Sequence, residues 1–241
     1  MAENEMKSGG LSVEQLMQRF YEDYSRREKQ EKLERFRRLN PYVKPGQILF
    51  VGSSLMEQFP IYEFSQDFDL PCTVCNRGVG GFTTIELLEN MDVCVYALKP
   101  AHIFINIGTN DLNGPDYSQE ELIERYALIL RGIRERLPEA KLYLLAYFPV
   151  NTEVGSRIPY MKEILQYRTN ARIRAANEAV RALAEKFGAE YLDLNGPLYD
   201  ERGELKAEYT VEGMHMYANG YKPILDQMLP LLEKIHCLSE E

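Results

Sequence analysis

One stretch near the start of the chain decides the fold, and it runs Gln47-Ile48-Leu49-Phe50-Val51-Gly52-Ser53-Ser54-Leu55-Met56. Four β-prone residues, 48–51, stand between a Pro-Gly pair and a glycine. This pattern predicts a short strand buried on both faces at the centre of a parallel sheet. Two serines follow where that strand ends. Ligands of open α/β sheets bind at the carboxyl ends of the strands, so we take Ser54 as the candidate nucleophile.

Strands and helices alternate along the rest of the chain. Runs of β-prone residues predict four further strands, at about residues 73–77, 101–107, 142–148 and 190–194. Helical patterns are expected at residues 118–137 and about 163–187, with a loop at 149–160. Such alternation is typical of a five-stranded parallel sheet covered by helices on both faces, so the expected fold class is α/β. Residues 46–241 contain no Gly/Ser/Pro-rich break, which predicts a single domain.

Composition narrows the classes of partner. The 241 residues carry a net charge of −9, with a pI near 5.1, which argues against binding to nucleic acid or to an anionic membrane. No apolar run approaches the roughly 20 residues of a membrane-spanning helix. Residues 1–7 lack the apolar core of a secretory signal. We therefore expect a cytoplasmic protein that acts on a small molecule.

The cysteines and histidines form no pattern typical of a disulfide framework or a metal site. Cys72 and Cys75 have the spacing of a redox pair, but they fall on a predicted strand, so a buried structural pair is the favoured interpretation. The three histidines are widely separated, which argues against a zinc cluster. We expect neither a metal nor a cofactor.

An amphipathic helix is predicted within residues 1–45, before the first strand. Ser12 and Gln15 form a capping-box pattern, apolar residues recur at helical spacing, and Asn40-Pro41 ends the helix. The favoured interpretation is a helix packed on its own domain with a basic face in solvent. The alternative is an arm or clamp used in a homodimer.

Two polar clusters follow the second and third predicted strands. The segment 76–84 contains three glycines, but Thr83 stands where a dinucleotide-binding G-x-G-x-x-G pattern needs its last glycine. The free amide groups of such a turn, at the start of a helix, suit an oxyanion. The cluster Gly108-Thr109-Asn110-Asp111 either belongs to a functional site or is an ordinary Asx-rich turn.

A carboxylate and an imidazole lie close together near the end of the chain, because Glu212 precedes His215 by three residues on a glycine-containing loop. At this spacing the carboxylate is able to accept the Nδ1–H and leave the other ring nitrogen free as a base. His102 begins the third strand, roughly 20 Å from its carboxyl end at about 3.3 Å per residue, and His236 lies in the polar tail. His215 is therefore the candidate base.

Four segments described above, taken in order, resemble the sequence blocks of the GDSL, or SGNH, hydrolase family. Gly52-Ser53-Ser54-Leu55 is similar to the first block, Gly-Asp-Ser-Leu, and Gly81 falls at the oxyanion-hole glycine of the second. Residues 108–111 match the third block, and Glu212-x-x-His215 stands where the last block has Asp-x-x-His. The resemblance spans residues 48–221 and implies a three-layer α/β/α, flavodoxin-like fold.

The resemblance also implies the chemistry. Ser54, His215 and Glu212 are expected to form the catalytic triad of an ester hydrolase that works through an acyl-enzyme intermediate. The backbone amides of Ser54 and Gly81, with the side-chain amide of Asn110, are expected to form the oxyanion hole.

Two residues depart from the family pattern. Ser53 replaces the aspartate of the first block, which changes the hydrogen bonding under the nucleophile. Glu212 replaces the triad aspartate and adds one methylene, and Ser-His-Glu triads are known on hydrolase folds. Asp193, at the end of the fifth strand, is the fallback group for orienting the histidine.

The expected substrate is a short-chain, chiefly acetyl, ester of a carbohydrate. The predicted loops carry polar residues and no long apolar insertion that covers a fatty chain; these residues are Asn113, Asp116, Asn151 and Arg157. The aromatic segment 56–70 either walls an acyl pocket or packs on the sheet edge. Alternative functions are a lysophospholipase or thioesterase of the same family, a catalytically silent carbohydrate-binding module, and a flavin or nucleotide binder.

Overall fold

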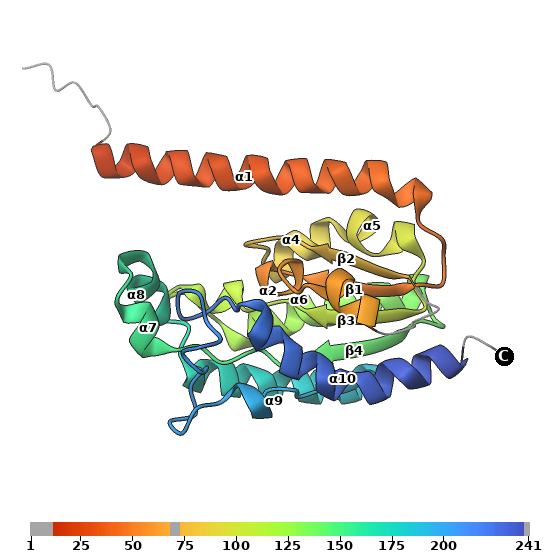
Figure 1. The fold of residues 1–241 in the computed structure, drawn as a ribbon. Helices are drawn as coiled ribbons and strands as arrows, with labels where there is room; N and C mark the ends of the chain where they lie inside the picture. Colours follow the sequence, from red (N-terminus) through yellow and green to blue (C-terminus); the bar gives the residue numbers. More distant parts are fainter. Residues whose placement is uncertain (1–11, 68–72, 239–241) are drawn as a thin grey trace, which may run out of the picture.

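A five-stranded parallel sheet forms the centre of the protein, as a computed structural model that describes residues 12–67 and 73–238 shows (Figure 1). The strands lie in the order β2-β1-β3-β4-β5. Their bounds are β1 Ile48–Gly52, β2 Val74–Gly78, β3 His102–Asn106, β4 Lys141–Leu145 and β5 Glu190–Leu192. This order is that of flavodoxin-like doubly wound folds, so the predicted α/β class is confirmed.

Strand β1 is buried on both faces, as its uninterrupted apolar run predicts. Leu49 and Val51 contribute to the core on one face of the sheet, whereas Ile48 and Phe50 contribute to the core on the other. The alternation follows from the two-residue period of a strand. The carboxyl ends of all five strands lie at one edge of the sheet, where Ser54 follows β1.

Helices cover both faces of the sheet and complete three layers. The core on the first face includes side chains of α4 (Thr84–Glu89), α5 (Met91–Cys94), α6 (Gln119–Arg136) and α9 (Asn170–Phe187). The core on the second face includes side chains of α2 (Ser54–Glu57), α3 (Ile61–Phe64) and α10 (Ala218–Leu238). Two short helices, α7 (Thr152–Ser156) and α8 (Pro159–Leu165), lie near the carboxyl edge of the sheet (Figure 1).

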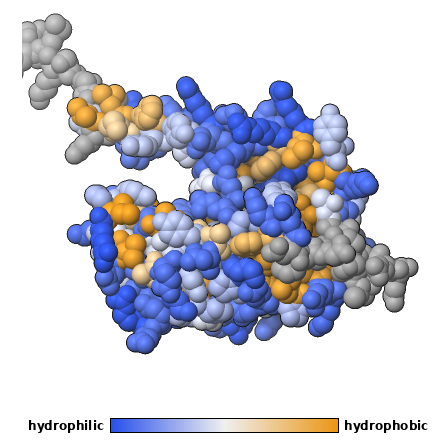
Figure 2. All heavy atoms as spheres, in the orientation of Figure 1, coloured by the Kyte–Doolittle hydropathy of each residue, from blue (hydrophilic) through white to orange (hydrophobic). Residues whose placement is uncertain are grey.

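Helix α1 (Val13–Leu39) packs on the domain over its carboxyl-terminal part only. It begins with the predicted capping box between Ser12 and Gln15, and Leu33 enters the core beneath it. Its amino-terminal half stands apart from the rest of the domain in the view of Figures 1 and 2 and exposes apolar side chains, which include Val13, Leu16, Met17, Phe20 and Tyr24. At 3.6 residues per turn these side chains lie on the opposite side of the helix from Leu33. Figure 2 shows an apolar patch at the free end of the helix.

One predicted helix was wrong. The sequence pattern indicated a continuous helix over about residues 163–187, but the chain forms α8 and α9 with a break at residues 166–169. Thr169 marks the start of the second helix, because its hydroxyl accepts the N–H of Arg172 and caps α9. The predicted loop 149–160 contains α7 and the start of α8.

The remaining expectations concern the cysteines, the aromatic segment and the membrane. Cys75 is buried with a free thiol, whereas Cys72 lies outside the described residues. In the aromatic segment, Phe59 and Ile61 are buried in the second core, so the described part of this segment packs on the sheet. Phe68 also lies outside the described residues. No helix in the described ranges is long and apolar enough to cross a membrane.

Candidate active site

The candidate nucleophile lies directly after β1. Gly52, the last residue of β1, stands beside Asn106 of β3, and a Cβ atom there would lie 2.0 Å from the Asn106 carbonyl oxygen. Only glycine allows this close approach. Ser54 is the first residue of α2, a position whose backbone N–H has no acceptor within its own helix. The chain therefore presents both the hydroxyl and the amide of Ser54 at the carboxyl edge of the sheet.

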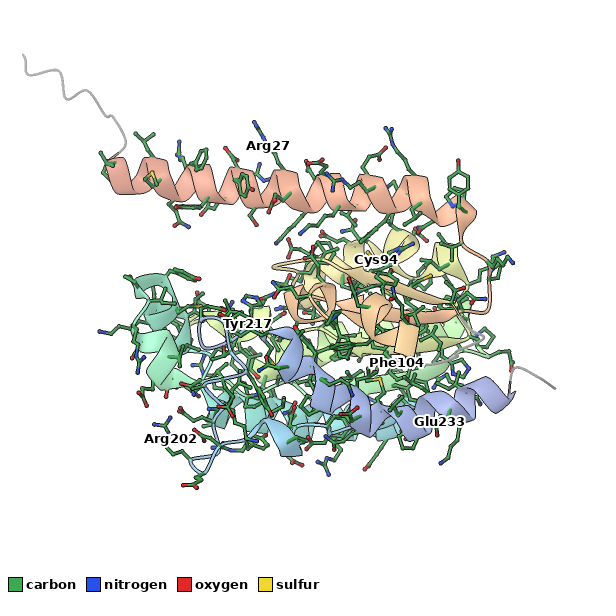
Figure 3. The ribbon with its side chains drawn as sticks, viewed as in Figure 1. Arg27, Cys94, Phe104, Arg202, Tyr217 and Glu233 are labelled. Atoms are coloured by element: carbon green, nitrogen blue, oxygen red, sulfur yellow. The ribbon has the colours of Figure 1, made fainter. Side chains whose placement is uncertain are left out.

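A tight loop carries Glu212 and His215. The loop is closed at its base by a bridge between Thr210 and Met216, and the Thr210 hydroxyl accepts the Gly213 N–H at 2.8 Å. Gly213 has a φ of +104°, which favours glycine. Tyr217, labelled in Figure 3, stands between this loop and the first residue of α10, Ala218. The loop is thus built to hold a fixed shape.

The structure brings Ser54, His215 and Glu212 into one line of contacts. Nε2 of His215 lies 2.8 Å from Oγ of Ser54, although the two residues are 161 positions apart in the sequence. Nδ1 of the same ring lies 2.5 Å from Oε1 of Glu212, which also accepts the backbone N–H of His215 at 3.1 Å. The extra methylene of Glu212 therefore does not prevent contact with the ring.

The electrostatics of this contact favour an ionised carboxylate. Glu212 is only 5% exposed, and burial acts to raise its pKa. The hydrogen bonds from the ring and the backbone of His215, together with attraction to the imidazole, outweigh that effect and hold the pKa of Glu212 below its ordinary value. A carboxylate that stays charged is able to stabilise a protonated imidazole beside it.

The turn after β2 positions Gly81 close to this line of contacts. Gly81 has a φ of +74°, and its N–H donates to no acceptor among the described residues. The neighbouring Gly80 N–H is held by Oε2 of Glu57 at 2.6 Å, and Nζ of Lys29 contacts the Gly81 carbonyl oxygen at 3.0 Å. The turn is therefore fixed from two sides while one amide remains available.

Asn110 lies against the same turn. It follows β3, and its Nδ2 donates to the Phe82 carbonyl oxygen at 2.9 Å, so the side chain reaches the residue next to Gly81. The following residue, Asp111, accepts the Thr84 N–H at 3.0 Å and so joins this segment to the start of α4. The structure thus places the amide group of Asn110 beside the glycine turn.

Three other residues considered from the sequence lie away from these contacts or are not described. Asp193 accepts the Asn195 N–H at 3.2 Å and pairs with Arg181 at 3.9 Å, whereas Glu212 occupies Nδ1 of His215. His102 contacts the Tyr143 hydroxyl at the start of β3. The side chain of His236 is not described.

The serine that replaces the first-block aspartate is fully buried. The hydroxyl of Ser53 has no hydrogen-bond partner in the described ranges. Ser53 is therefore shielded from solvent, while the adjacent Ser54 is only partly buried and contacts His215. Of the two serines, Ser54 is the one that a substrate is able to reach.

Sequence analysis missed one residue of this region, Arg168. It is 2% exposed, and its Nη2 donates to Oδ1 of Asn110 at 2.7 Å. In the sequence, a lone arginine within a predicted continuous helix gives no indication of a functional role. The capping residue Thr169 was the available indication that Arg168 lies in a break between two helices.

Comparison with known proteins agrees with this geometry. The model of the GDSL-like lipase/acylhydrolase family matches residues 62–222, which is more than half of the chain. The matched range contains Gly81, Asn110, Glu212 and His215, and it begins after Ser54, whose place in the site rests on its contact with His215. The fold and the family match define the protein as a hydrolase of ester bonds. The chain belongs to the GDSL-like lipase/acylhydrolase family.

Individual relatives cover most of the chain. Platelet-activating factor acetylhydrolase IB subunit alpha2 of Homo sapiens is 25% identical over 197 residues, which are 79% of this chain and 80% of the relative. A solved structure from Streptococcus pneumoniae is 30% identical, with a TM-score of 0.79, and covers 90% of this chain and 98% of its own. The acetylxylan esterase Axe2 of Geobacillus stearothermophilus shares the fold at 14% identity, with a TM-score of 0.59 and coverage of 79% and 95%.

Proposed function

We propose that this protein is a serine esterase that removes short acyl groups, chiefly acetyl, from carbohydrate esters. The observation that carries the proposal is the line of contacts from Ser54 Oγ through the His215 ring to Glu212, at 2.8 and 2.5 Å. A serine is a weak nucleophile until a base accepts its proton, and a base needs a fixed ring orientation. These contacts supply both requirements.

The first half of the proposed reaction forms an acyl-enzyme. Ser54 Oγ attacks the carbonyl carbon of the ester while Nε2 of His215 takes its proton. The carbonyl oxygen becomes an oxyanion, and the amides of Ser54 and Gly81 with the side-chain amide of Asn110 donate hydrogen bonds to it. Collapse of this intermediate expels the alcohol, which receives the proton from His215.

The second half releases the acyl group. A water molecule loses a proton to Nε2 of His215 and attacks the acyl carbon, and the same donors hold the second oxyanion. The carboxylic acid leaves and Ser54 regains its proton. The Glu212 carboxylate stabilises the protonated ring in both halves, which is why an ionised Glu212 matters.

Two observations support a small acyl group and a polar alcohol. The names of the human relative and of the Geobacillus esterase both refer to acetyl groups. A cavity of about 250 Å³ is lined by Asn110 but not by Ser54 or His215, and its lining is mainly polar, with Thr83, Asp116 and Glu121 among the residues. Such a cavity suits hydroxyl groups better than an acyl chain. Another cavity, of about 450 Å³, lies between α1 and α2–α3, and none of Ser54, Asn110 and His215 lines it.

The test is hydrolysis of p-nitrophenyl esters of increasing chain length, followed by acetylated xylo-oligosaccharides, with wild type, Ser54→Ala and Ser53→Ala. We expect kcat/KM to be highest for the acetyl ester, to be abolished in Ser54→Ala and to be largely retained in Ser53→Ala. An active Ser54→Ala variant would refute the triad. Wild type that binds acetylated sugar without hydrolysing it would support a silent binding module instead.

A second candidate substrate is platelet-activating factor, which the name of the human relative mentions. The same assay distinguishes it when platelet-activating factor and acetylated xylo-oligosaccharide are compared at matched concentrations. A preference for platelet-activating factor by a factor of ten or more in kcat/KM, about 1.4 kcal/mol, would replace the carbohydrate proposal and leave the triad intact. Maximal activity on long-chain esters or thioesters would favour a lysophospholipase or thioesterase.

A further inference from the structure

A buried cation lies behind the candidate oxyanion hole. Arg168 occupies the break between α8 and α9 and is 2% exposed. Its guanidinium makes three side-chain contacts: Nη2 donates to Asn110 Oδ1 at 2.7 Å, Nε donates to Asn113 Oδ1 at 2.8 Å, and Nη1 contacts the sulfur of Met214. Met214 directly precedes His215. One side chain thus contacts both the Asn110 segment and the loop of the histidine.

The contact with Asn110 determines which way its amide faces. A guanidinium has donors and no acceptor, so only the oxygen of the Asn110 amide is able to face it. The nitrogen must then point to the other side, where it donates to the Phe82 carbonyl oxygen beside Gly81. The Phe82 carbonyl oxygen, which only accepts, and Nδ2 of Asn113, which donates to Asn110 Oδ1 at 3.4 Å, favour the same orientation. Arg168 adds the charged and shorter contact to Oδ1.

The charge of Arg168 lacks a carboxylate partner. No Asp or Glu lies within ion-pair distance of it in the residues that the structure describes. Burial lowers the pKa of Arg168 to about 9, against the attraction of Glu212 and Asp111, so the guanidinium stays charged at neutral pH. An unpaired buried charge is costly unless an anion forms nearby. In the proposed reaction an oxyanion forms one hydrogen-bonded group away.

We infer that Arg168 is a positioning residue of the oxyanion hole, which turns the Asn110 amide nitrogen toward the glycine turn and strengthens its N–H donor with a buried positive charge. The inference rests on the proposed function. A donor whose own oxygen accepts from a cation is polarised and donates more strongly, as in cooperative hydrogen-bond chains. The effect belongs to the transition state, because the oxyanion is absent from the bound ester.

The experiment measures kcat and KM for p-nitrophenyl acetate with Arg168→Met and Arg168→Lys. We expect Arg168→Met to lower kcat by about 10- to 100-fold with KM within about twofold, which is less than the loss expected for a direct donor. Arg168→Lys keeps the charge without the planar fork and should lie between Arg168→Met and wild type. The control is Arg172→Met, which removes a nearby cation that donates to the Gly114 carbonyl oxygen and not to Asn110.

The same substitutions in an Asn110→Ala background separate positioning from a general structural role. If Arg168 acts through Asn110, Arg168→Met should cost no more than about twofold once Asn110 is gone, because coupled residues are non-additive. Losses that multiply in full, or an Arg168→Met variant with the kcat of wild type, would overturn the assignment of Arg168. Absence of Ser54-dependent hydrolysis in wild type would instead overturn the proposed function and this inference together.

A second variant guards against loss of folding in Arg168→Met. Asn113→Asp places a carboxylate where Nε of Arg168 already donates at 2.8 Å, so it pairs the buried charge, and it also removes the long 3.4 Å contact from Asn113 Nδ2 to Asn110 Oδ1. We expect a melting temperature equal to or higher than that of wild type, because the buried charge is now paired. We expect kcat to fall several-fold, because the new carboxylate offsets the positive charge that polarises Asn110. A rise in kcat on pairing the charge would overturn the inference.

Discussion

Glu212 is the residue at which this chain departs from the aspartate of the last family block. Its carboxylate accepts both the ring and the backbone N–H of His215. Glu212→Gln keeps the shape but offers an amide that misorients the ring or fixes the wrong tautomer. We expect kcat/KM to fall on the order of 10³-fold, and Glu212→Asp to retain more activity than the Gln variant. Equal kcat/KM for the three proteins between about pH 6 and 9 would show that Glu212 does not orient the ring.

The depressed pKa of Glu212 also predicts a pH dependence of stability. The ionised carboxylate contributes stability above the pKa of the unfolded chain, about 4.3, and this contribution is lost as the pH falls through the lower folded-state pKa. Glu212→Gln does not titrate. The difference in free energy of unfolding between wild type and Glu212→Gln should therefore shrink as the pH falls from about 5. Urea unfolding of both proteins at a series of pH values measures this difference. A difference that stays constant as the pH falls below about 5 would contradict the prediction.

Asn110 is expected to act only when the oxyanion forms. Asn110→Ala should lower kcat by about 10² to 10³-fold with KM little changed, and Asn110→Asp should be worse because its charge repels the oxyanion. Steady-state kinetics on p-nitrophenyl acetate provide the measurement. An Asn110→Asp variant with the kcat of wild type would identify Asn110 as an ordinary turn residue.

At the scale of elements, α1 contacts the glycine turn that carries Gly81. Nζ of Lys29 contacts the Gly81 carbonyl oxygen and pairs with Glu86 at 2.7 Å. Lys29→Met should lower kcat by about 3- to 10-fold, because small displacements of a donor weaken a site. The matched control is Arg26→Met on the same helix, whose side chain pairs with Asp23 in solvent. Equal losses in both variants would show that the effect does not pass through the turn.

The free half of α1 should be dispensable for the fold and for the reaction. The described side chains of residues 13–25 are exposed, so deletion of residues 1–25 should shift the melting temperature by less than about 4 °C and leave kcat unchanged. A large loss of either would show that this half of α1 supports the domain. The homodimer that the alternative interpretation of this helix implies stays a prediction, and sedimentation of wild type and of the deletion variant at matched concentrations tests it.

Some elements were predictable because their signal is local. The buried run 48–51, the capping box at Ser12 and the strand-ending polar clusters all follow from short patterns, and the structure has elements at these places. The helix break at 166–169 was missed because the apolar spacing continues across it. The projection of α1 was also missed, since periodicity shows which face of a helix is apolar and not whether another element covers it.

At the scale of the whole molecule, the parallel sheet explains how distant blocks meet. Three of the four segments directly follow β1, β2 and β3 and reach one edge of the sheet, because parallel strands end on the same side. The loop of Glu212 and His215, which precedes α10, meets them there through the contact of His215 with Ser54. That gathering follows from topology and was expected from the strand pattern. Arg168 was beyond sequence reasoning, because its role depends on a contact with Asn110 across 58 positions.

The most direct test of the account is to identify the residue that a fluorophosphonate modifies. Ser54 is partly buried and contacts His215, whereas the neighbouring Ser53 is fully buried. We expect mass spectrometry of peptides from the treated protein to find one phosphonate on Ser54, none in Ser54→Ala, and an unchanged label in Ser53→Ala. A label on Ser53, or no label on native protein that hydrolyses acetyl esters, would contradict the assignment of Ser54 as the nucleophile.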